Sequence, residues 1–390
     1  VDDWTAVGTI AVVAGDLPPG KFEIQGKGSR DSASGRIVDS EVLGGKVSGE
    51  VAYTWADRQP WLARLELKSV DLTALFPDWP AVVSGRMDGE GTAEPFAMHA
   101  VLEGVEGVLR GESIGADGVV DIADGDVSVS GLRVDHGESS ASLDGALMTS
   151  DGLRFDARIA DLSLYIDTLG GEVLAAGTLS LAEAGHVDAA VRSPKLSIND
   201  LVLTDVEARL QASDDGQSVA LVGTYEGTPF QAELGGAFAD WRKPHASRFE
   251  GQVRTLEVDL GDEHSMALSE PAPVTFAEGE FAVEDLCLSA AVGASVCGTA
   301  QWSQDGDYGV NLALQNVPID FVEHVADSPL LFDQRISGTL DWQYTFGSGP
   351  RGSGRLTVSA GSMAPVEEPD TLVATGEGVL DFDIERGRLL

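Results

Sequence analysis

Apolar and polar residues alternate with a period of two along most of the chain. In residues 61–68, Leu65 and Leu67 lie in one set of alternate positions, and charged side chains fill most of the other set. The same alternation recurs in residues 154–159, 206–211, 310–315 and 380–385. Successive side chains of a strand point to opposite faces of its sheet, so each segment predicts a β-strand with one apolar and one polar face.

Short runs rich in Gly, Asp and Ser separate these strands, as in residues 214–216 and 305–307, and they predict hairpin turns. If one strand and its turn take about 13 residues, the chain holds roughly 30 strands. A sheet with one apolar face must cover that face. Since helices are scarce, the sheet packs on a second sheet, closes into a barrel, or curls around a ligand.

Three short helix candidates follow strands at similar places, in residues 72–76, 162–169 and 319–325. They lie inside a repeat whose copies run from Gly49 to Gly85, from Gly145 to Gly177 and from Gly298 to Gly338, with a looser fourth copy from Gly236. The repeat favours stacked β units, although a β-rich chain also produces chance matches of this kind. No segment marks a domain boundary, so we expect residues 1–390 to form one continuous, repetitive β segment with a few short helices.

The charge balance excludes nucleic acid as a partner. The chain has 64 acidic and 25 basic residues, a formal net charge of −39, and its Lys and Arg residues form no cluster. Binding along a nucleic-acid backbone requires clustered basic side chains, and so does binding to anionic headgroups through a polybasic face. The 47 glycines are spread along the whole chain, which favours many turns and bulges over one flexible linker.

Motifs for catalysis or metal binding are weak. Residues 111–115 fit the Gly-x-Ser-x-Gly pattern of a nucleophile elbow, but that motif needs a strand–turn–helix context, and strand-like alternation surrounds it here. The six histidines are scattered without ligand spacing, and phosphate-binding and dinucleotide-binding loops are missing from the sequence. We therefore expect a protein that is not an enzyme, uses no cofactor or metal, and keeps its histidines solvated or locally hydrogen-bonded.

Residues 223–340 resemble the TamB family of AsmA-like envelope proteins. The similarity includes a strand, glycine and second strand in residues 223–236, and a Leu-Cys pair followed by Cys-Gly-x-x-x-Trp in residues 286–302. It continues through the strand and Pro-led segment of residues 312–321, and weaker similarity covers residues 49–89. The two cysteine phrases at this spacing are the most specific part of the resemblance.

The resemblance implies an elongated β-groove, a bent sheet with an apolar concave face, in the periplasm of a Gram-negative envelope. It implies a role in phospholipid transport between the inner and outer membranes and, as part of a translocation and assembly module, in outer-membrane protein assembly and protein secretion. Proteins of this family also carry an inner-membrane anchor and a C-terminal domain that engages an outer-membrane barrel partner of the TamA type. The chain looks like a middle segment that lacks both parts.

If the apolar face lines a lipid groove, as the resemblance implies, the alternating strands supply candidates for contact with acyl chains. These candidates are Leu65, Leu67, Phe155, Ile159, Val206, Leu210, Val310, Leu312, Leu314 and Phe382. Alternation does not determine which face points inward. Two other functions stay open: a chaperone-like scaffold that guides outer-membrane strands by edge pairing without conducting lipid, and a closed β-solenoid of an adhesin or polysaccharide-processing protein.

Cys287 and Cys297 lie on what we expect to be adjacent strands, where a hairpin would bring them within disulfide reach. The oxidising compartment that the resemblance implies favours a disulfide, and two small buried thiols are the alternative. The tryptophans of the repeat, Trp61 and Trp342 among them, are expected to pack at strand ends, with direct lipid contact as the alternative.

Overall fold

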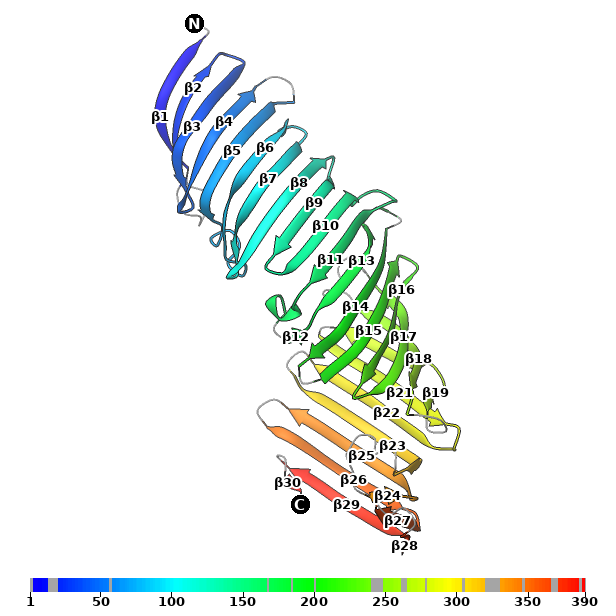
Figure 1. Ribbon diagram of the computed structural model, residues 1–390. Helices are drawn as coiled ribbons and strands as arrows, with labels where there is room; N and C mark the ends of the chain where they lie inside the picture. Colours follow the sequence, from blue (N-terminus) through cyan, green and yellow to red (C-terminus); the bar gives the residue numbers. More distant parts are fainter. Residues whose placement is uncertain are drawn as a thin grey trace. The chain divides into compact units, whose positions relative to one another are not determined.

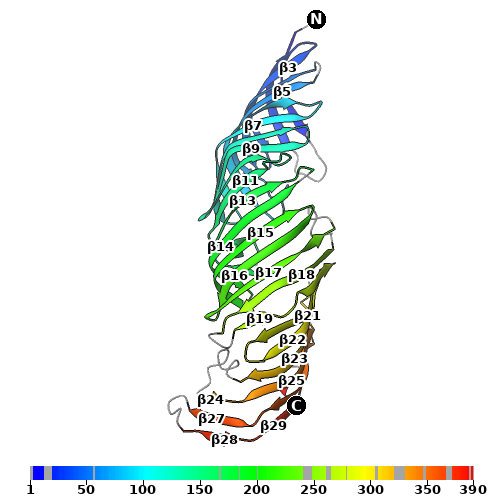
Figure 2. The same cartoon turned by 90° about the vertical axis from the view of Figure 1, so that its right-hand side faces the viewer.

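The computed structural model describes residues 3–12, 20–55, 58–166, 168–183, 185–199, 201–239, 248–260, 265–277, 279–303, 306–319, 330–345, 348–365, 371–385 and 388–389 (Figures 1 and 2). Within these residues the elements are 30 β-strands and one 3-10 helix, η1 (Leu162–Leu164). One hydrogen-bonded sheet contains 27 strands, and a smaller sheet contains three. The expected all-β class is confirmed, and the number of strands agrees with the number expected.

The expected short helices are largely wrong. Residues 72–76 form one turn closed by hydrogen bonds to the Leu72 carbonyl oxygen. In residues 162–169 only η1 is helical, and β12 (Leu169–Gly170) follows it. Most of the third candidate, residues 319–325, lies outside the described residues. A single turn makes too few backbone hydrogen bonds to propagate a helix. Among the described residues, no helix is long and apolar enough to cross a lipid bilayer.

The chain divides into two compact units, Val1–Ala189 and Ala190–Leu390. In the first unit, each strand pairs antiparallel with the next in chain order, and β11 pairs with β13. Figure 1 shows these strands side by side. They are β1 (Trp4–Val12), β2 (Gly20–Gly28), β3 (Ser32–Val42), β4 (Gly45–Thr54), β5 (Pro60–Asp71), β6 (Ala81–Thr92), β7 (Ala97–Leu109), β8 (Glu112–Ala123), β9 (Asp126–His136), β10 (Ser139–Ala146), β11 (Leu153–Ile159) and β13 (Val173–Ser180).

The division between the units falls within β14 (His186–Ile198). The strands of the main sheet that follow are β15 (Leu201–Ser213), β16 (Gly216–Tyr225), β17 (Thr228–Phe238), β18 (Phe249–Val258), β19 (Met266–Leu268), β20 (Ala272–Ala277), β21 (Glu280–Ala290), β22 (Ser295–Ser303), β23 (Tyr308–Pro318), β25 (Arg335–Thr345), β26 (Gly349–Val358), β29 (Gly378–Glu385) and β30 (Arg388–Leu389). The small sheet consists of β24 (Leu330–Phe332), β27 (Gly361–Pro365) and β28 (Val373–Thr375).

A bulge recurs in these strands, and in four places it follows the same construction. Two residues of one strand face a single Ser or Asp of the next strand, and the second of the two has a φ between 50° and 57°. Its N–H donates to the oxygen of the opposing side chain. The four donor–acceptor pairs are Ser69–Ser84 (2.9 Å), Gly104–Asp117 (2.6 Å), Gly131–Asp144 (3.1 Å) and Asn316–Ser337 (2.9 Å).

A glycine follows each acceptor, and the backbone requires it. Gly85, Gly118, Gly145 and Gly338 have φ values of 153°, 143°, 116° and 151°, a region that L side chains rarely adopt. A Cβ on Gly85 would lie 2.7 Å from the Cα of Val105 in the neighbouring strand. Three of these glycines also bound the copies of the sequence repeat, so the repeat reflects the spacing of the bulges. Bulges bend a strand and increase its twist.

We expect Gly338→Ala to lower the free energy of unfolding by about 1–3 kcal/mol, because the added methyl meets the carbonyl oxygen of Arg355 and the φ is strained. Gly378 in the same unit has open space around it, so Gly378→Ala should change stability by less than about 0.5 kcal/mol. Urea unfolding of the two variants measures the difference. Equal stability of both variants would contradict the role assigned to Gly338.

Candidate functional site on the apolar face

The apolar side chains of the first unit line up in rows across the strands. Their central row is made of small residues, with Val51 the largest: Ala6, Gly26, Gly35, Val51, Ala63, Gly89 and Ala100. A row with larger side chains lies on one side, with Trp4, Tyr53, Trp61 and Met98. A second such row lies on the other side, with Ile24, Ile37, Leu65, Met87 and Leu102. Small residues between two bulky rows make a trough across the strands.

An apolar hollow of about 580 Å³ lies over this trough at β1–β5. Trp4, Tyr53 and Trp61 line one end, and Ile24 lies towards the other. Gly26 and Gly35 form part of the floor, where a side chain would fill the space. The volume is in the range of small-molecule binding sites, and such sites are usually lined by apolar and aromatic side chains.

The two edges of the apolar face differ. In the first unit we call the strand ends joined after β2, β4 and β6 the hairpin edge, because short connections join them. The opposite ends form the strap edge, because two longer connections join strands there. These are the first strap, residues 72–80, and the second strap, residues 160–166 and 168–172.

The two straps share one backbone construction. The Leu72 N–H donates to the Ala81 carbonyl oxygen (2.7 Å), and the Leu162 N–H donates to the Gly171 carbonyl oxygen (3.0 Å). An aspartate also lies at the start of each strap, Asp71 just before the first and Asp161 within the second. Its carboxylate accepts an N–H from two residues later, from Thr73 to Asp71 (2.9 Å) and from Ser163 to Asp161 (3.0 Å). The first two copies of the sequence repeat therefore correspond in structure at this position.

A buried histidine holds the second strap against the sheet. His136 is 5% exposed and lies on the apolar face at the end of β9. Its Nε2 is 3.0 Å from the Leu109 carbonyl oxygen, and its Nδ1 is 2.8 Å from the Tyr165 hydroxyl. A carbonyl only accepts, so in the neutral ring Nε2 donates and Nδ1 accepts from Tyr165. His136 is thus a locally hydrogen-bonded histidine of the kind expected from the sequence.

Arg110 joins both straps at the same place. It donates to the Leu164 carbonyl oxygen of the second strap (2.8 Å), and its guanidinium lies 4.9 Å from the centre of the Trp79 ring in the first strap. The rings of Trp79 and Tyr165 are 6.2 Å apart. The straps therefore cover the apolar face along the strap edge, whereas the trough and its hollow stay open towards the hairpin edge.

The apolar face of the second unit is partly closed and partly open. Over β18–β21, Ala272 is 0% exposed and Val274 is 1% exposed, and Phe249 packs with them. A second cluster lies near the ends of β19, β21 and β23, where Met266 and Val317 are buried with Ala290 and Ala294, and Leu260 packs against them. From β22 to β29 the face is more open, and Leu380 is an exposed side chain of that part.

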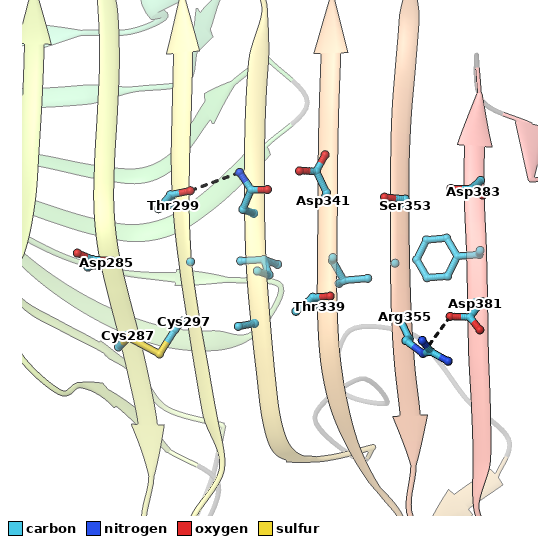
Figure 3. Close-up of a pocket in the computed structure, with 17 residues that line it drawn as sticks. Asp285, Cys287, Cys297, Thr299, Thr339, Asp341, Ser353, Arg355, Asp381 and Asp383 are labelled. Atoms are coloured by element: carbon cyan, nitrogen blue, oxygen red, sulfur yellow. Dashed lines mark hydrogen bonds and ion pairs between the residues drawn. A yellow bond between two sulfur atoms is a disulfide. The ribbon is translucent and has the colours of Figure 1, made fainter.

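The polar face of the second unit also has a hollow, of about 820 Å³ (Figure 3). Arg355 and Asp381 form an ion pair across it (3.3 Å), and Asn311 donates to the Thr299 hydroxyl (3.5 Å). Asp285, Asp341 and Asp383 also line it. This hollow was not expected from the sequence, which gave candidate contacts only on the apolar face.

Cys287 and Cys297 face one another across β21 and β22 in this polar hollow, with their Cα atoms 4.0 Å apart, and a disulfide joins their sulfur atoms (Figure 3). The register of the hairpin brings the two residues together, because Leu286 pairs with Gly298 and Leu288 pairs with Val296. The disulfide thus locks one strand pair on its polar side.

The ten candidates for acyl-chain contact all lie on the apolar face of their unit. Leu65, Leu67, Phe155 and Ile159 do so in the first unit, and Val206, Leu210, Val310, Leu312, Leu314 and Phe382 do so in the second. Their exposure differs. Val206 is 3% exposed and is part of the core, whereas Leu210 is 38% exposed, and the other candidates are half-buried.

Large side chains lie over glycines of adjacent strands. Trp61 covers Gly91, where a Cβ would come within 3.0 Å of its ring, and Trp342 covers Gly352 in the same way at 2.8 Å. The Phe382 ring lies beside Gly354, where a Cβ would come within 2.6 Å of it. Trp61 and Trp342 thus pack on the sheet. The sequence interpretation missed Trp4, Tyr53 and Ile24 of the hollow. The signal that points to them is the pair Gly26 and Gly28 in β2 together with Gly35 in β3.

Comparison with known proteins identifies similarity in the first unit. Residues 1–180 match a family model described as "TamB, N-terminal domain". No solved structure matches the chain. The matched residues precede the segment, residues 223–340, in which the motif resemblance is clearest, and they include the apolar hollow and both straps. The matching model describes an N-terminal domain, whereas the resemblance suggested a middle segment.

The second strap should respond to acid through Asp161. Hydrogen bonds from the backbone and side chain of Ser163 hold the pKa of Asp161 below its ordinary value of 3.8. A depressed carboxyl pKa gives stability that is present above the ordinary value and is lost as the pH falls through the folded value. We expect the Ser163 amide resonance, followed by NMR in serine-labelled protein, to titrate below about pH 3.8. In Asp161→Asn the resonance should not titrate; an identical titration would contradict this assignment.

Removing the disulfide should weaken the β21–β22 hairpin. We expect Cys287→Ala with Cys297→Ala to lower stability by about 2–3 kcal/mol, as for a short closed loop. Amide exchange of β21 and β22 measures the loss, and exchange in β25 and β26 of the same protein serves as the internal control. Unchanged protection of both strand pairs would show that the disulfide adds nothing to the hairpin.

Proposed function

Since this chain belongs to the TamB family, we propose that it is a periplasmic bridge segment that binds the acyl chains of phospholipids on its open apolar face. In this proposal the segment carries phospholipid between the inner and outer membranes and supports outer-membrane protein assembly. It acts by binding and has no catalytic role. In the same proposal the protein is anchored in the inner membrane and contacts an outer-membrane barrel partner of the TamA type.

The observation that carries the proposal is the trough of the first unit and its hollow. A row of small residues lies between two rows that carry large apolar side chains, and a hollow of about 580 Å³ remains above it. Burying an acyl chain in such a place is worth about 0.8 kcal/mol per CH₂ group. A phospholipid has two chains that match this surface in polarity.

The residue types of the apolar face suit the movement of a bound acyl chain better than its tight binding at one place. The rows consist of Ala, Val, Leu, Ile, Met, Gly and aromatic residues that repeat from strand to strand, as in Leu65, Met87 and Leu102. Non-directional apolar contacts have similar strength at each strand. A bound chain therefore meets no single deep well along these strands, and it slides from one strand to the next at low cost.

The test is native mass spectrometry of the purified chain, with lipid extraction from the same sample. Wild-type protein should carry phospholipid. Replacement of Val310, Leu312 and Leu314 by Asp should remove most of the lipid bound to the second unit, because three charges would then line the apolar face of β23. The matched control replaces Asn311, Ala313 and Gln315 by Asp, which adds similar charge to the exposed polar face of the same strand.

The triple variants must be folded for this comparison, which far-UV circular dichroism verifies, and Leu312→Asp alone provides a milder change. Equal loss of lipid in the apolar-face and polar-face variants would refute the assigned face. A stable wild-type protein without bound lipid would favour the alternative, a scaffold for outer-membrane protein insertion or autotransporter secretion that conducts no lipid.

A further inference from the structure

One row of the second unit is aromatic on seven neighbouring strands. Register pairs connect each member to the next, from β17 through β18, β20, β21, β22 and β23 to β25. The row consists of Phe238, Phe249, Phe276, Phe281, Trp302, Tyr308 and Tyr344. Aromatic residues make up 6% of the chain, so seven in register is far from a random arrangement. We call this set the aromatic row.

The aromatic row lies on the apolar face, at the strand ends joined after β20, β22 and β25. These ends are the hairpin edge of the second unit. Tyr308 is two residues from Val310 in β23, which places both side chains on the same face. The opposite ends, joined after β18, β21 and β23, carry the buried cluster of Met266 and Val317 with Leu260. They correspond to the strap edge of the first unit.

The residue type and the solvent exposure of the aromatic row change along its length. Its phenylalanines pack into the closed part of the face, with Phe238 and Phe249 4.9 Å apart. The other members are more open, with Trp302 49% exposed and Tyr308 39% exposed. Tyr308 and Tyr344 stack with 5.1 Å between ring centres. The exposed part therefore consists of Trp and Tyr, the two aromatic types with a polar N–H or O–H group.

The distance between the two edges fits one layer of acyl chains. On β23 the apolar face carries Tyr308 at the hairpin edge, then Val310, Leu312 and Leu314, and then the buried Val317. Six residues of strand from Tyr308 to Leu314 span about 20 Å. The chains of one leaflet of a bilayer span about 15 Å, half of the hydrocarbon core. A lipid lying along the strand direction therefore has room for its chains between the edges.

We propose that phospholipid binds the second unit with its glycerol and headgroup region at Trp302, Tyr308 and Tyr344 and its chains directed towards the Val317 cluster. This inference rests on the proposed function. Trp and Tyr concentrate where an apolar layer meets water, because their rings are apolar and their N–H or O–H groups are polar. The strap edge does not suit a headgroup, because a charged group buried there would lose its hydration.

In the first unit, too, the two edges differ, with aromatic side chains of the strands at the hairpin edge and the straps at the opposite edge. Trp4, Tyr53 and Trp61 line the hollow at the hairpin end of β1–β5, and the straps contact the opposite edge of the same sheet at the ends of β7 and β9. Arg30 and Arg58 lie in the connections of that hairpin edge. Cations beside the aromatic end of an apolar hollow complement the phosphate of a headgroup. A phospholipid oriented in this way would have aromatic rings beside its glycerol, and its phosphate would lie at the edge that carries Arg30 and Arg58, with Asp31 in the same connection as Arg30.

The experiment uses two photoreactive phospholipids that differ only in the position of the diazirine, one on the headgroup and one at the end of an acyl chain. Each is loaded onto the whole chain, irradiated, and mapped by mass spectrometry. The headgroup probe should label peptides around Trp302, Tyr308 and Tyr344. The chain-end probe should label peptides around Leu314 and Val317.

Trp302→Phe with Tyr308→Phe keeps an aromatic ring at each position and removes the indole N–H and the phenol O–H. We expect headgroup labelling at the hairpin edge to fall roughly fivefold for each hydrogen bond lost, with acyl labelling unchanged. The matched control, Gln301→Ala with Gln343→Ala, changes the polar face beside the same hairpins and should leave both patterns as in wild type. A fall of equal size in this control would contradict the role of the aromatic row.

The outcomes separate the inference from the proposed function. Labelling by both probes at both edges, or the reverse orientation, overturns the inference and leaves lipid binding in place. Labelling by neither probe overturns the proposed function and the inference with it. Headgroup labelling confined to the hairpin edge, and reduced by the Phe variants alone, supports the assigned orientation.

Discussion

The hydrogen bond from a bulged N–H to a Ser or Asp side chain of the next strand is the constraint on which much of this sheet depends. A bulge inserts one extra residue and would leave its N–H without a partner, and the opposing side chain accepts that N–H. The glycine after the acceptor allows the neighbouring backbone to approach closely. Together they bend the strands while each strand keeps its apolar residues on one face.

Because no second layer of the same size packs on this sheet in the described residues, its apolar side chains must be shielded from water in other ways. The described residues do so in three ways. Straps held by Asp71, Asp161 and His136 cover one edge in the first unit. Large side chains such as Trp61 and Phe382 lie over glycines of neighbouring strands. The remainder stays open, as a trough with an apolar hollow in the first unit and as the less covered part of the face from β22 to β29 in the second.

This partial cover connects the fold with the proposed lipid carriage. A fully covered face would leave no room for a ligand, and a fully open face would favour aggregation. The acidic polar face, with a formal net charge of −39 for the chain, opposes association between copies. One edge of the apolar face is covered, and the other carries aromatic residues with polar groups. The two edges therefore differ in polarity, as do the chain end and the headgroup end of an amphiphile.

Alternation, turn residues and glycine spacing are local features. From them the sequence by itself determined the all-β class and the approximate number of strands, and it singled out residues 72–76 and 162–169, which lie in the straps, as short helix candidates. It also placed all ten candidate side chains on the apolar face. The local pattern wrongly predicted short helices in the straps, because a single capped turn begins with the same residue types as a helix. Only the tertiary structure decided that Val206 is buried, that a hollow forms between Ile24 and Trp61, and that seven aromatic residues form one row. Those outcomes depend on the register between strands, which bulges and hydrogen bonds set between residues far apart in the chain.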